Sequence, residues 1–399
     1  MREGKTGGSI LGFLNRCSGR IKEWAQGDWD ILLVILLLGT AVRVYLALSG
    51  QVQQGVSETW TISGLSSITP KGALDTLTPP LYPVIVHISK ILAGRSHPIG
   101  LFLIQAVLSS ISIALVYDAG RKMFCRRTGL VAAAVIAIYP NLILSSLRIR
   151  PDSVLVFLIL LIMALSVSRI RENIKACGLA VIMGLSIMLT PIAIFIVPGV
   201  VFSTRRRILF LIVLAVTLAP WAVRNSTRIN RMVPVYDRAA YSVSFDKYSL
   251  GTAGPNRDRW KPLHRIYIEI ETLFGRSWNE LTNEEPQNQG LRNSNYMMTW
   301  SYILVLFLGL AGMIRHFGRR HLAAGLPVIG YIVLLIFITD FQMGDRILLE
   351  PLLIIFLAAL FAYRLPGDGK DSEAGSGKEQ KPEKAPGPKK EPGPAQDRP

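Results

Sequence analysis

Arginines and acids lie at the ends of long apolar runs in this chain. They are Arg43, Arg148, Arg150, Asp152, Arg224, Arg346 and Glu350, with Asn225 and Asp345 beside two of the arginines. A charge at membrane depth usually marks a binding site or an internal ion pair. The planar guanidinium donates two hydrogen bonds at once to a phosphate, so the group predicts a site for an anionic ligand at the membrane surface. The alternative for any single arginine is that it only snorkels to the interface.

The apolar runs that carry these residues are long enough to cross a bilayer. The first extends from Ile31 to Ser49 and the last from Ile347 to Tyr363, in a chain of 399 residues of which 50% are hydrophobic. About 18 to 20 apolar residues span the hydrocarbon core, so we expect an all-α, polytopic membrane protein with about 10 transmembrane helices. We expect it in the inner (plasma) membrane, and we see no cleavable signal peptide before Ile31.

The net charge of +17 is distributed in small clusters between the apolar runs. The four main clusters are Arg121, Lys122, Arg126 and Arg127; Arg169, Arg171 and Lys175; Arg205, Arg206 and Arg207; and Arg315, Arg319 and Arg320. Cytoplasmic loops are rich in Lys and Arg, so the clusters predict an orientation with both termini in the cytoplasm. They are explained by topology and indicate no nucleic-acid partner.

This orientation predicts spans at about 30–49, 98–118, 129–147, 153–168, 207–223, 297–314, 321–339 and 346–363. The loops 50–97 and 224–296 lie outside, and loops of this length are usually functional or disordered. We therefore expect the chain to have three parts: a basic cytoplasmic N-terminus at 1–29, a membrane domain at 30–363, and a cytoplasmic tail at 364–399. The tail is rich in Pro, Gly, Lys and Glu, so we expect it to be disordered.

Two apolar segments do not fit as simple spans. As one helix, 177–203 would put Arg205–Arg207 outside, so we expect it to break at Thr190-Pro191 into two short helices that return to the cytoplasm. Counting 79–94 as a span would also break the charge alternation. We expect a helix at the outer membrane surface there, started by Pro79 and Pro80.

Metal chemistry is not indicated. His87, His97 and His264 are scattered, and no His, Cys or paired acids have metal-ligand spacing. Cys17, Cys125 and Cys177 all fall on the predicted cytoplasmic side, so we interpret them as free thiols. We expect no cofactor.

Several short motifs, taken in order, resemble one family. The run Ala219-Pro220-Trp221-Ala222-Val223-Arg224-Asn225, followed by Arg231-Met232-Val233-Pro234-Val235, resembles the "PW..RN....G..vPv" signature of bacterial glycosyltransferase family 39-like proteins. These are relatives of protein O-mannosyltransferases and of the lipid A aminoarabinose transferase. The other matching segments are Thr78–Pro83 ("PPLYP"), Gly120–Phe124 ("GRRLF"), Tyr139-Pro140 through Arg150–Ser153 ("YP…(T/P)E") and Asp345–Pro351 ("RYRLPLEP").

The resemblance covers about residues 30–363 and implies a C-type membrane glycosyltransferase with its active site on the outer face. The implied donor is a sugar on a polyprenyl phosphate, and the acceptor is a hydroxyl of a lipid, glycan or protein. In the family an acid in the first outer loop is the general base. Here Val56 occupies the expected aspartate position, so Glu58 is the best substitute and Asp75 the second. Substrate-binding roles are implied for Arg224, Asn225, Arg346, Arg150, Asp152 and Tyr82, with the arginines stabilising the departing phosphate.

The missing aspartate leaves an alternative open. A relative with the same fold could bind or transport a lipid-linked sugar without catalysis. A third reading is another lipid-linked glycan enzyme, such as an O-antigen polymerase or ligase, although these lack the "PW..RN" motif.

Overall fold

The computed structural model describes residues 29–49, 79–94, 97–229, 289–316, 328–329 and 349–363. All regular structure in these ranges is helical, in agreement with the expected all-α fold. The chain divides into two compact units, Met1–Tyr363 and Arg364–Pro399. The predicted tail, the basic N-terminus and most of the predicted span 321–339 lie outside the described residues.

The helices are α2 (Trp29–Ser49), α4 (Leu81–Ala93), α5 (His97–Met123), α6 (Arg126–Ile138), α7 (Pro140–Ser145), α8 (Asp152–Ser166), α9 (Glu172–Leu189), the 3-10 helix η3 (Pro191–Ile196), α10 (Val197–Ser203), α11 (Arg207–Ile229), α15 (Gln289–Arg315) and α17 (Glu350–Ala362). Within the described residues, α2, α9 and most of α5 and α11 are long and apolar enough to cross a membrane. Helices α4, α8 and α17 and part of α15 are apolar but shorter. The number of spans therefore stays a prediction.

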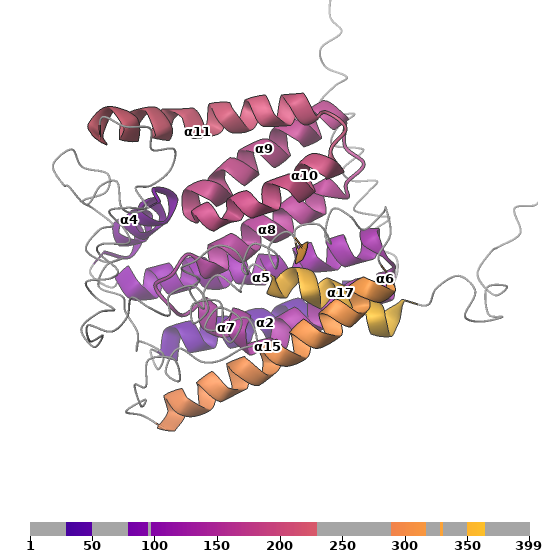
Figure 1. The fold of residues 1–399 in the computed structure, drawn as a ribbon. Coiled ribbons are helices and arrows are strands. Elements are labelled where there is room, and N and C mark those ends of the chain that lie inside the picture. The colour runs from indigo at the N-terminus through magenta and orange to yellow at the C-terminus, as the bar shows by residue number, and fades with distance from the viewer. Residues whose placement is uncertain are drawn as a thin grey trace, which may run out of the picture. The chain divides into compact units, whose positions relative to one another are not determined.

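The helices pack in a series of neighbours around α5, which contacts α2, α4, α6 and α8. Helix α8 contacts α9, and α9 contacts α11; on the other side α6 contacts α17, and α17 contacts α15. In the view of Figure 1, α11 lies at the top of this series and α15 at the bottom. The short helices α8 and α17 are buried along nearly their whole length, whereas α2 and α11 expose most of their apolar side chains. Apolar exposure of this extent fits contact with lipid.

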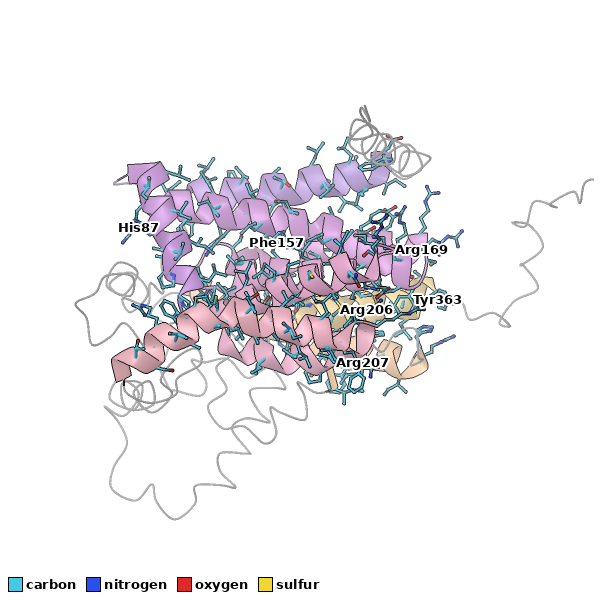
Figure 2. The ribbon with its side chains drawn as sticks, turned by 90° about the horizontal axis from the view of Figure 1, so that it is seen from above. His87, Phe157, Arg169, Arg206, Arg207 and Tyr363 are labelled. Atoms are coloured by element: carbon cyan, nitrogen blue, oxygen red, sulfur yellow. The ribbon has the colours of Figure 1, made fainter. Side chains whose placement is uncertain are left out.

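Turns between the helices lie at two ends of the helical series. Figure 2 labels Arg169, Arg206, Arg207 and Tyr363 at one end and His87 at the other. We call these the basic end and the opposite end. The basic end carries the turns predicted to be cytoplasmic.

The predicted break in 177–203 is confirmed. Thr190 is extended, with φ −148° and ψ 115°, and Pro191 begins η3. A residue before proline avoids the helical conformation, so the chain can turn back here. The first arm is longer than predicted, because α9 already begins at Glu172 and has 18 residues. The pair is therefore not two short helices: its first arm is long enough to span.

The predicted span 129–147 is not one continuous helix, because it is divided at Tyr139-Pro140. Helix α6 ends at Ile138, Tyr139 has ψ 116°, and Pro140 is the first residue of α7. Proline has no N–H, so it cannot donate to the carbonyl of Ile136 four residues earlier. The apolar run of the sequence continues through this point, but the helix is interrupted.

Arg43 supplies the donors that the break removes. Its Nη2 donates to the carbonyl of Ile136 at 2.9 Å, and its Nη1 donates to those of Ala137 at 3.0 Å and Gly39 at 2.9 Å. Its Nε donates to Ser109 Oγ at 2.8 Å. Arg43 is fully buried. It was predicted as part of a charged surface group, and the structure corrects this: Arg43 joins α2 to α5 and α6.

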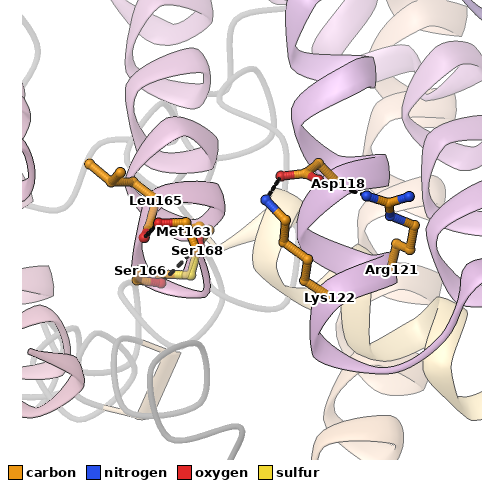
Figure 3. Close-up of polar contacts among 7 residues, drawn as sticks. All are labelled: Asp118, Arg121, Lys122, Met163, Leu165, Ser166 and Ser168. Atoms are coloured by element: carbon orange, nitrogen blue, oxygen red, sulfur yellow. Dashed lines mark hydrogen bonds and ion pairs between the residues drawn. The ribbon is translucent and has the colours of Figure 1, made fainter. Parts of the chain in front are cut away.

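Several charges and polar groups at the basic end are paired locally. Figure 3 shows Asp118 of α5 between Arg121 and Lys122, with Arg121 Nη2 3.7 Å from the carboxylate and Lys122 hydrogen-bonded to it. It also shows the hydroxyls of Ser166 and Ser168 donating to carbonyls in the last turn of α8. These contacts lie within single helices, so they fit a structural role for Asp118. Cys125 and Cys177 are free thiols, as expected.

Candidate functional site

The opposite end contains a buried polar network built from three segments. Tyr82 comes from α4, Gln105 from α5, and Arg150 and Asp152 from the turn into α8. Gln105 Nε2 donates to the phenol oxygen of Tyr82 and to the carbonyl oxygen of Arg150, both at 3.0 Å. Tyr82 and Gln105 are fully buried, and Asp152 is buried. Three of the predicted site residues are therefore brought together, across 70 positions of the chain from 82 to 152.

Proline positions two of these segments. Pro80 caps α4, so the helix predicted over 79–94 is present and extends from Leu81 to Ala93, before Gly94 with its positive φ of 59°. This left-handed conformation is one that glycine adopts without strain. Pro151 caps α8 and puts Asp152 at its first residue. A carboxylate is favoured there because the N-terminus of a helix carries partial positive charge.

The electrostatics of the turn centre on Asp152. Arg150 Nε lies 3.3 Å from Asp152 Oδ2, and the Arg150 side chain is 31% exposed while that of Asp152 is 10% exposed. Arg148 adds a second positive charge that acts on the same carboxyl. The turn therefore presents a partly accessible guanidinium next to a shielded acid. Burial raises the pKa of the Tyr82 phenol, so Tyr82 keeps its proton.

Gln105 is the functional candidate that the sequence reasoning missed. It is the only amide in the apolar run 98–118, and an amide in such a run is expensive to bury unless it is hydrogen-bonded. That signal was available in the sequence. Its partners, 23 and 45 residues away, were not.

A second polar cluster joins α7 to α17. Asn141 Nδ2 donates to Glu350 Oε1 at 2.8 Å, and Tyr139 Oη lies 3.2 Å from the same nitrogen. Glu350 is the first residue of α17 and is buried, as is Asn141. The cluster anchors the start of α17, and the predicted phosphate ligand Arg346 lies four residues before Glu350. Arg346 itself, like Glu58 and Asp75, is outside the described residues.

Arg224 and Asn225 lie on another helix. The Arg224 guanidinium lies 4.3 Å from the centre of the Trp221 ring, and its Nη1 donates to Asn225 Oδ1 at 3.2 Å. Asn225 is fully buried. This pair is on α11, which packs on α9 and α10. The structure thus holds the predicted "PW..RN" residues in one local cluster, on a different helix from the Tyr82 network.

Among the described residues, no group of three or more His, Cys, Asp or Glu could hold a metal ion. The chemistry these residues offer is hydrogen bonding and charge: guanidinium groups beside a carboxylate, a phenol and amides. Such a set suits an anionic oxygen ligand.

Residues 78–224 match the family described as dolichyl-phosphate-mannose-protein mannosyltransferase. The match begins just before α4 and ends at Arg224, so it includes Tyr82, Gln105, Arg150 and Asp152. The resemblance to glycosyltransferase family 39-like proteins is thereby confirmed over this part of the chain. No curated protein sequence matches the chain significantly.

Solved structures share the fold. The crystal structure of ArnT from Cupriavidus metallidurans bound to undecaprenyl phosphate superposes with a TM-score of 0.56 at 14% identity, covering 84% of this chain and 60% of that one. The apo form of the same protein gives a TM-score of 0.54, with the same identity and coverage. The Archaeoglobus fulgidus oligosaccharyltransferase in the apo form gives 0.53 at 15% identity, covering 84% of this chain and 50% of that one. The chain therefore shares the fold of these two proteins, and it spans 50–60% of their length.

Proposed function

We propose that the protein is a membrane glycosyltransferase that moves a sugar from a polyprenyl phosphate to an acceptor hydroxyl on the outer face of the membrane. One observation carries the proposal. Tyr82, Gln105, Arg150 and Asp152 form a single network inside the segment that matches the mannosyltransferase family. A solved structure with the same fold is bound to undecaprenyl phosphate.

In the proposed reaction, one bond forms and one breaks at the anomeric carbon, and one proton moves to a loop acid. A loop acid, Glu58 or Asp75, takes the proton of the acceptor hydroxyl. The acceptor oxygen then attacks the anomeric carbon, and the bond from that carbon to the phosphate oxygen breaks. Polyprenyl phosphate leaves with the electron pair, and positive side chains stabilise its charge. Arg150, Arg224 and Arg346 are the proposed phosphate ligands, with Asp152, Tyr82 and Asn225 as further substrate-binding residues.

Arg150 is well suited to this role in the described residues. Its Nε faces Asp152, and its side chain is partly exposed. The carboxylate holds one edge of the guanidinium while its terminal nitrogens can donate to a ligand. Asp152 would thus orient Arg150, and the start of α8 would face the phosphate with its favourable dipole.

The test is a transfer assay with purified full-length protein in nanodiscs. A panel of labelled polyprenyl-phosphate sugars is supplied with a membrane lipid and glycan extract as acceptor, and both transferred label and released polyprenyl phosphate are measured. We expect turnover with at least one donor, reduced about tenfold or more in Arg150→Lys, because the charge remains and the planar fork is lost. Arg126→Lys at the basic end is the matched control and keeps full activity.

The alternative reading has a distinct outcome. Wild-type protein that binds polyprenyl phosphate and transfers nothing from any donor would be a non-catalytic binding or transport protein. Protein that neither binds polyprenyl phosphate nor transfers sugar would contradict the proposal altogether.

A further inference from the structure

The turns that lead into α9 and α11 carry exposed arginines that no acid neutralises. These arginines, which we call the arginine surface, are Arg169, Arg171, Arg205, Arg206 and Arg207. Among the residues that the structure describes, none of them forms an ion pair with an acid. Other cations at the basic end differ, since Lys122 is bonded to Asp118 and Lys175 lies 3.9 Å from Glu172. The arginine surface therefore keeps its full positive charge.

The two turns of the arginine surface lie side by side at the basic end. Helix α9 contacts α11, and α10 contacts both α8 and α11. The helices α9 and α11 are close, because a Cβ placed on Gly184 of α9 would lie only 2.6 Å from Thr217 Cγ2 of α11. Both helices begin at the basic end, where Figure 2 labels Arg169, Arg206 and Arg207. The charges of the two turns therefore act on one region of the surface.

Exposed apolar side chains flank these arginines. Phe202 is exposed just before them, and Ile208, directly after them, is 76% exposed. Ile208 is followed by Leu211, Ile212 and Val216, which are exposed as well. This spacing puts the four side chains of α11 on one helix face. An apolar stripe on a helix long enough to span contacts lipid tails, so the arginines at its start lie at the level of the lipid headgroups.

The exposed basic turn before α6 has no such stripe. Arg126 and Arg127 are exposed there. Helix α6, all of whose residues the structure describes, exposes no large apolar side chain before Ile138 at its far end. The preference of cytoplasmic loops for Lys and Arg accounts for the charge of both turns. It does not account for the position of the arginine surface next to a lipid-facing helix face.

We propose that the arginine surface binds the headgroups of anionic phospholipids in the leaflet at the basic end of the protein. The guanidinium groups donate paired hydrogen bonds to the phosphate oxygens, and the acyl chains of the same lipids lie along the exposed face of α11. Basic clusters beside a span are attracted to an anionic leaflet. The arginine surface and the Tyr82 network are at different ends of the molecule, so this inference does not rest on the proposed function.

The test measures equilibrium binding of lipids labelled on the acyl chain to full-length protein in detergent micelles. Phosphatidylglycerol is the anionic probe, and phosphatidylcholine with the same acyl chains is the zwitterionic control. We expect the wild type to prefer phosphatidylglycerol. The variant Arg206→Gln with Arg207→Gln should bind phosphatidylglycerol about tenfold or more weakly, because each basic residue near an anionic surface contributes about fivefold. Its binding of phosphatidylcholine should change little.

A second pair of substitutions controls for net charge. Arg126→Gln with Arg127→Gln removes the same charge from the same end of the protein and should keep the preference for phosphatidylglycerol. Arg206→Lys with Arg207→Lys retains the charge, so it should lose less affinity than the glutamine pair. Gel filtration and circular dichroism show which variants fold.

Two further measurements apply if the glutamine pair at 206 and 207 does not fold. Arg169→Gln with Arg171→Gln then takes its place, with the same expected loss. In the wild type, raising sodium chloride from about 0.1 M to about 1 M shortens the screening length from about 10 Å to about 3 Å, so the preference for phosphatidylglycerol should decline.

Three results would overturn the inference. The first is a wild type that binds the two lipids equally well. The second is unchanged affinity for phosphatidylglycerol in a folded variant with two arginines of the arginine surface replaced by glutamine. The third is an equal loss from the control pair at 126 and 127, which would make net charge, and not this surface, the cause. A protein that transfers no sugar would contradict the proposed function and leave this inference intact.

Discussion

Replacing Arg43 with methionine should destabilise the protein without touching the proposed site. Methionine keeps an unbranched chain of similar length and removes all four hydrogen bonds of the guanidinium. Three of these bonds cross to other helices, to Ser109 on α5 and to the carbonyls of Ile136 and Ala137 on α6. The fourth goes to Gly39 on the same helix.

The size of the effect follows from these bonds. An interhelical hydrogen bond in a membrane protein contributes about 0.6 kcal/mol on average and about 1.7 kcal/mol at most, so three contribute roughly 2–5 kcal/mol. The Ile136 carbonyl gains no replacement donor, because Pro140 has no N–H. Removing a buried charge recovers part of the loss. We therefore expect Arg43→Met to lower the free energy of unfolding by about 2–3 kcal/mol, within the range of a large single-residue effect.

The assay is unfolding by titration with a denaturing detergent from mixed micelles, followed by helical circular dichroism. Ser109→Ala removes one of the three interhelical bonds and should cost about 0.6 kcal/mol. Tyr45→Ala changes a side chain on the same helix that is 70% exposed and should leave the free energy of unfolding nearly unchanged. The reasoning fails if Arg43→Met unfolds like the wild type. Unchanged stability together with lost binding of undecaprenyl phosphate would instead make Arg43 a ligand arginine.

Four other outcomes are expected. Gly312→Ala should destabilise the α15–α17 contact, because its methyl group would collide with the backbone carbonyl of Phe356, whereas Gly178→Ala meets only the flexible end of Leu165 at 3.1 Å and should be tolerated; thermal unfolding compares the two. Arg224→Lys and Arg346→Lys should each reduce transfer about tenfold or more, on the order of 1.4 kcal/mol, and wild-type rates in both folded variants would contradict the phosphate role. In the same assay Glu58→Gln should reduce turnover about 10²-fold, the lower end of general-base contributions; if only Asp75→Asn does so, Asp75 is the base. A cysteine at position 206, in a variant lacking the native thiols, should resist labelling from outside intact cells, and labelling there would invert the predicted topology after Pro191.

Local proline chemistry explains which parts of the fold could be predicted. The break at Thr190-Pro191 and the start of α4 at Pro80 follow from the restricted backbone of proline and its neighbour, so the sequence alone predicts both. Pro140 carries the same signal, but the apolar run around it is continuous, so hydropathy alone predicts one uninterrupted helix there. Hydropathy predicts where the chain crosses lipid, while proline predicts where the helix ends.

The partners of the polar residues could not be predicted in the same way. Arg43 bonds to groups 66, 93 and 94 residues away, and Gln105 to groups 23 and 45 residues away. Residue type and spacing along a single helix do not encode such pairings. The sequence predicts that charges gather at helix ends, and the structure shows which of the described charges are bonded to other protein groups.

The contacts that each arginine already makes with the protein distinguish arginines that look alike in the sequence. A guanidinium has five N–H groups, and Arg43 makes four hydrogen bonds to protein atoms while fully buried, so a phosphate could reach it only by breaking a helix junction. Arg150 faces Asp152 through Nε with its side chain 31% exposed, and its backbone is held by Gln105. A residue with a fixed backbone, an oriented guanidinium and access to solvent can accept a ligand without rearrangement. Of Arg43 and Arg150, Arg150 is therefore the one proposed to bind a phosphate.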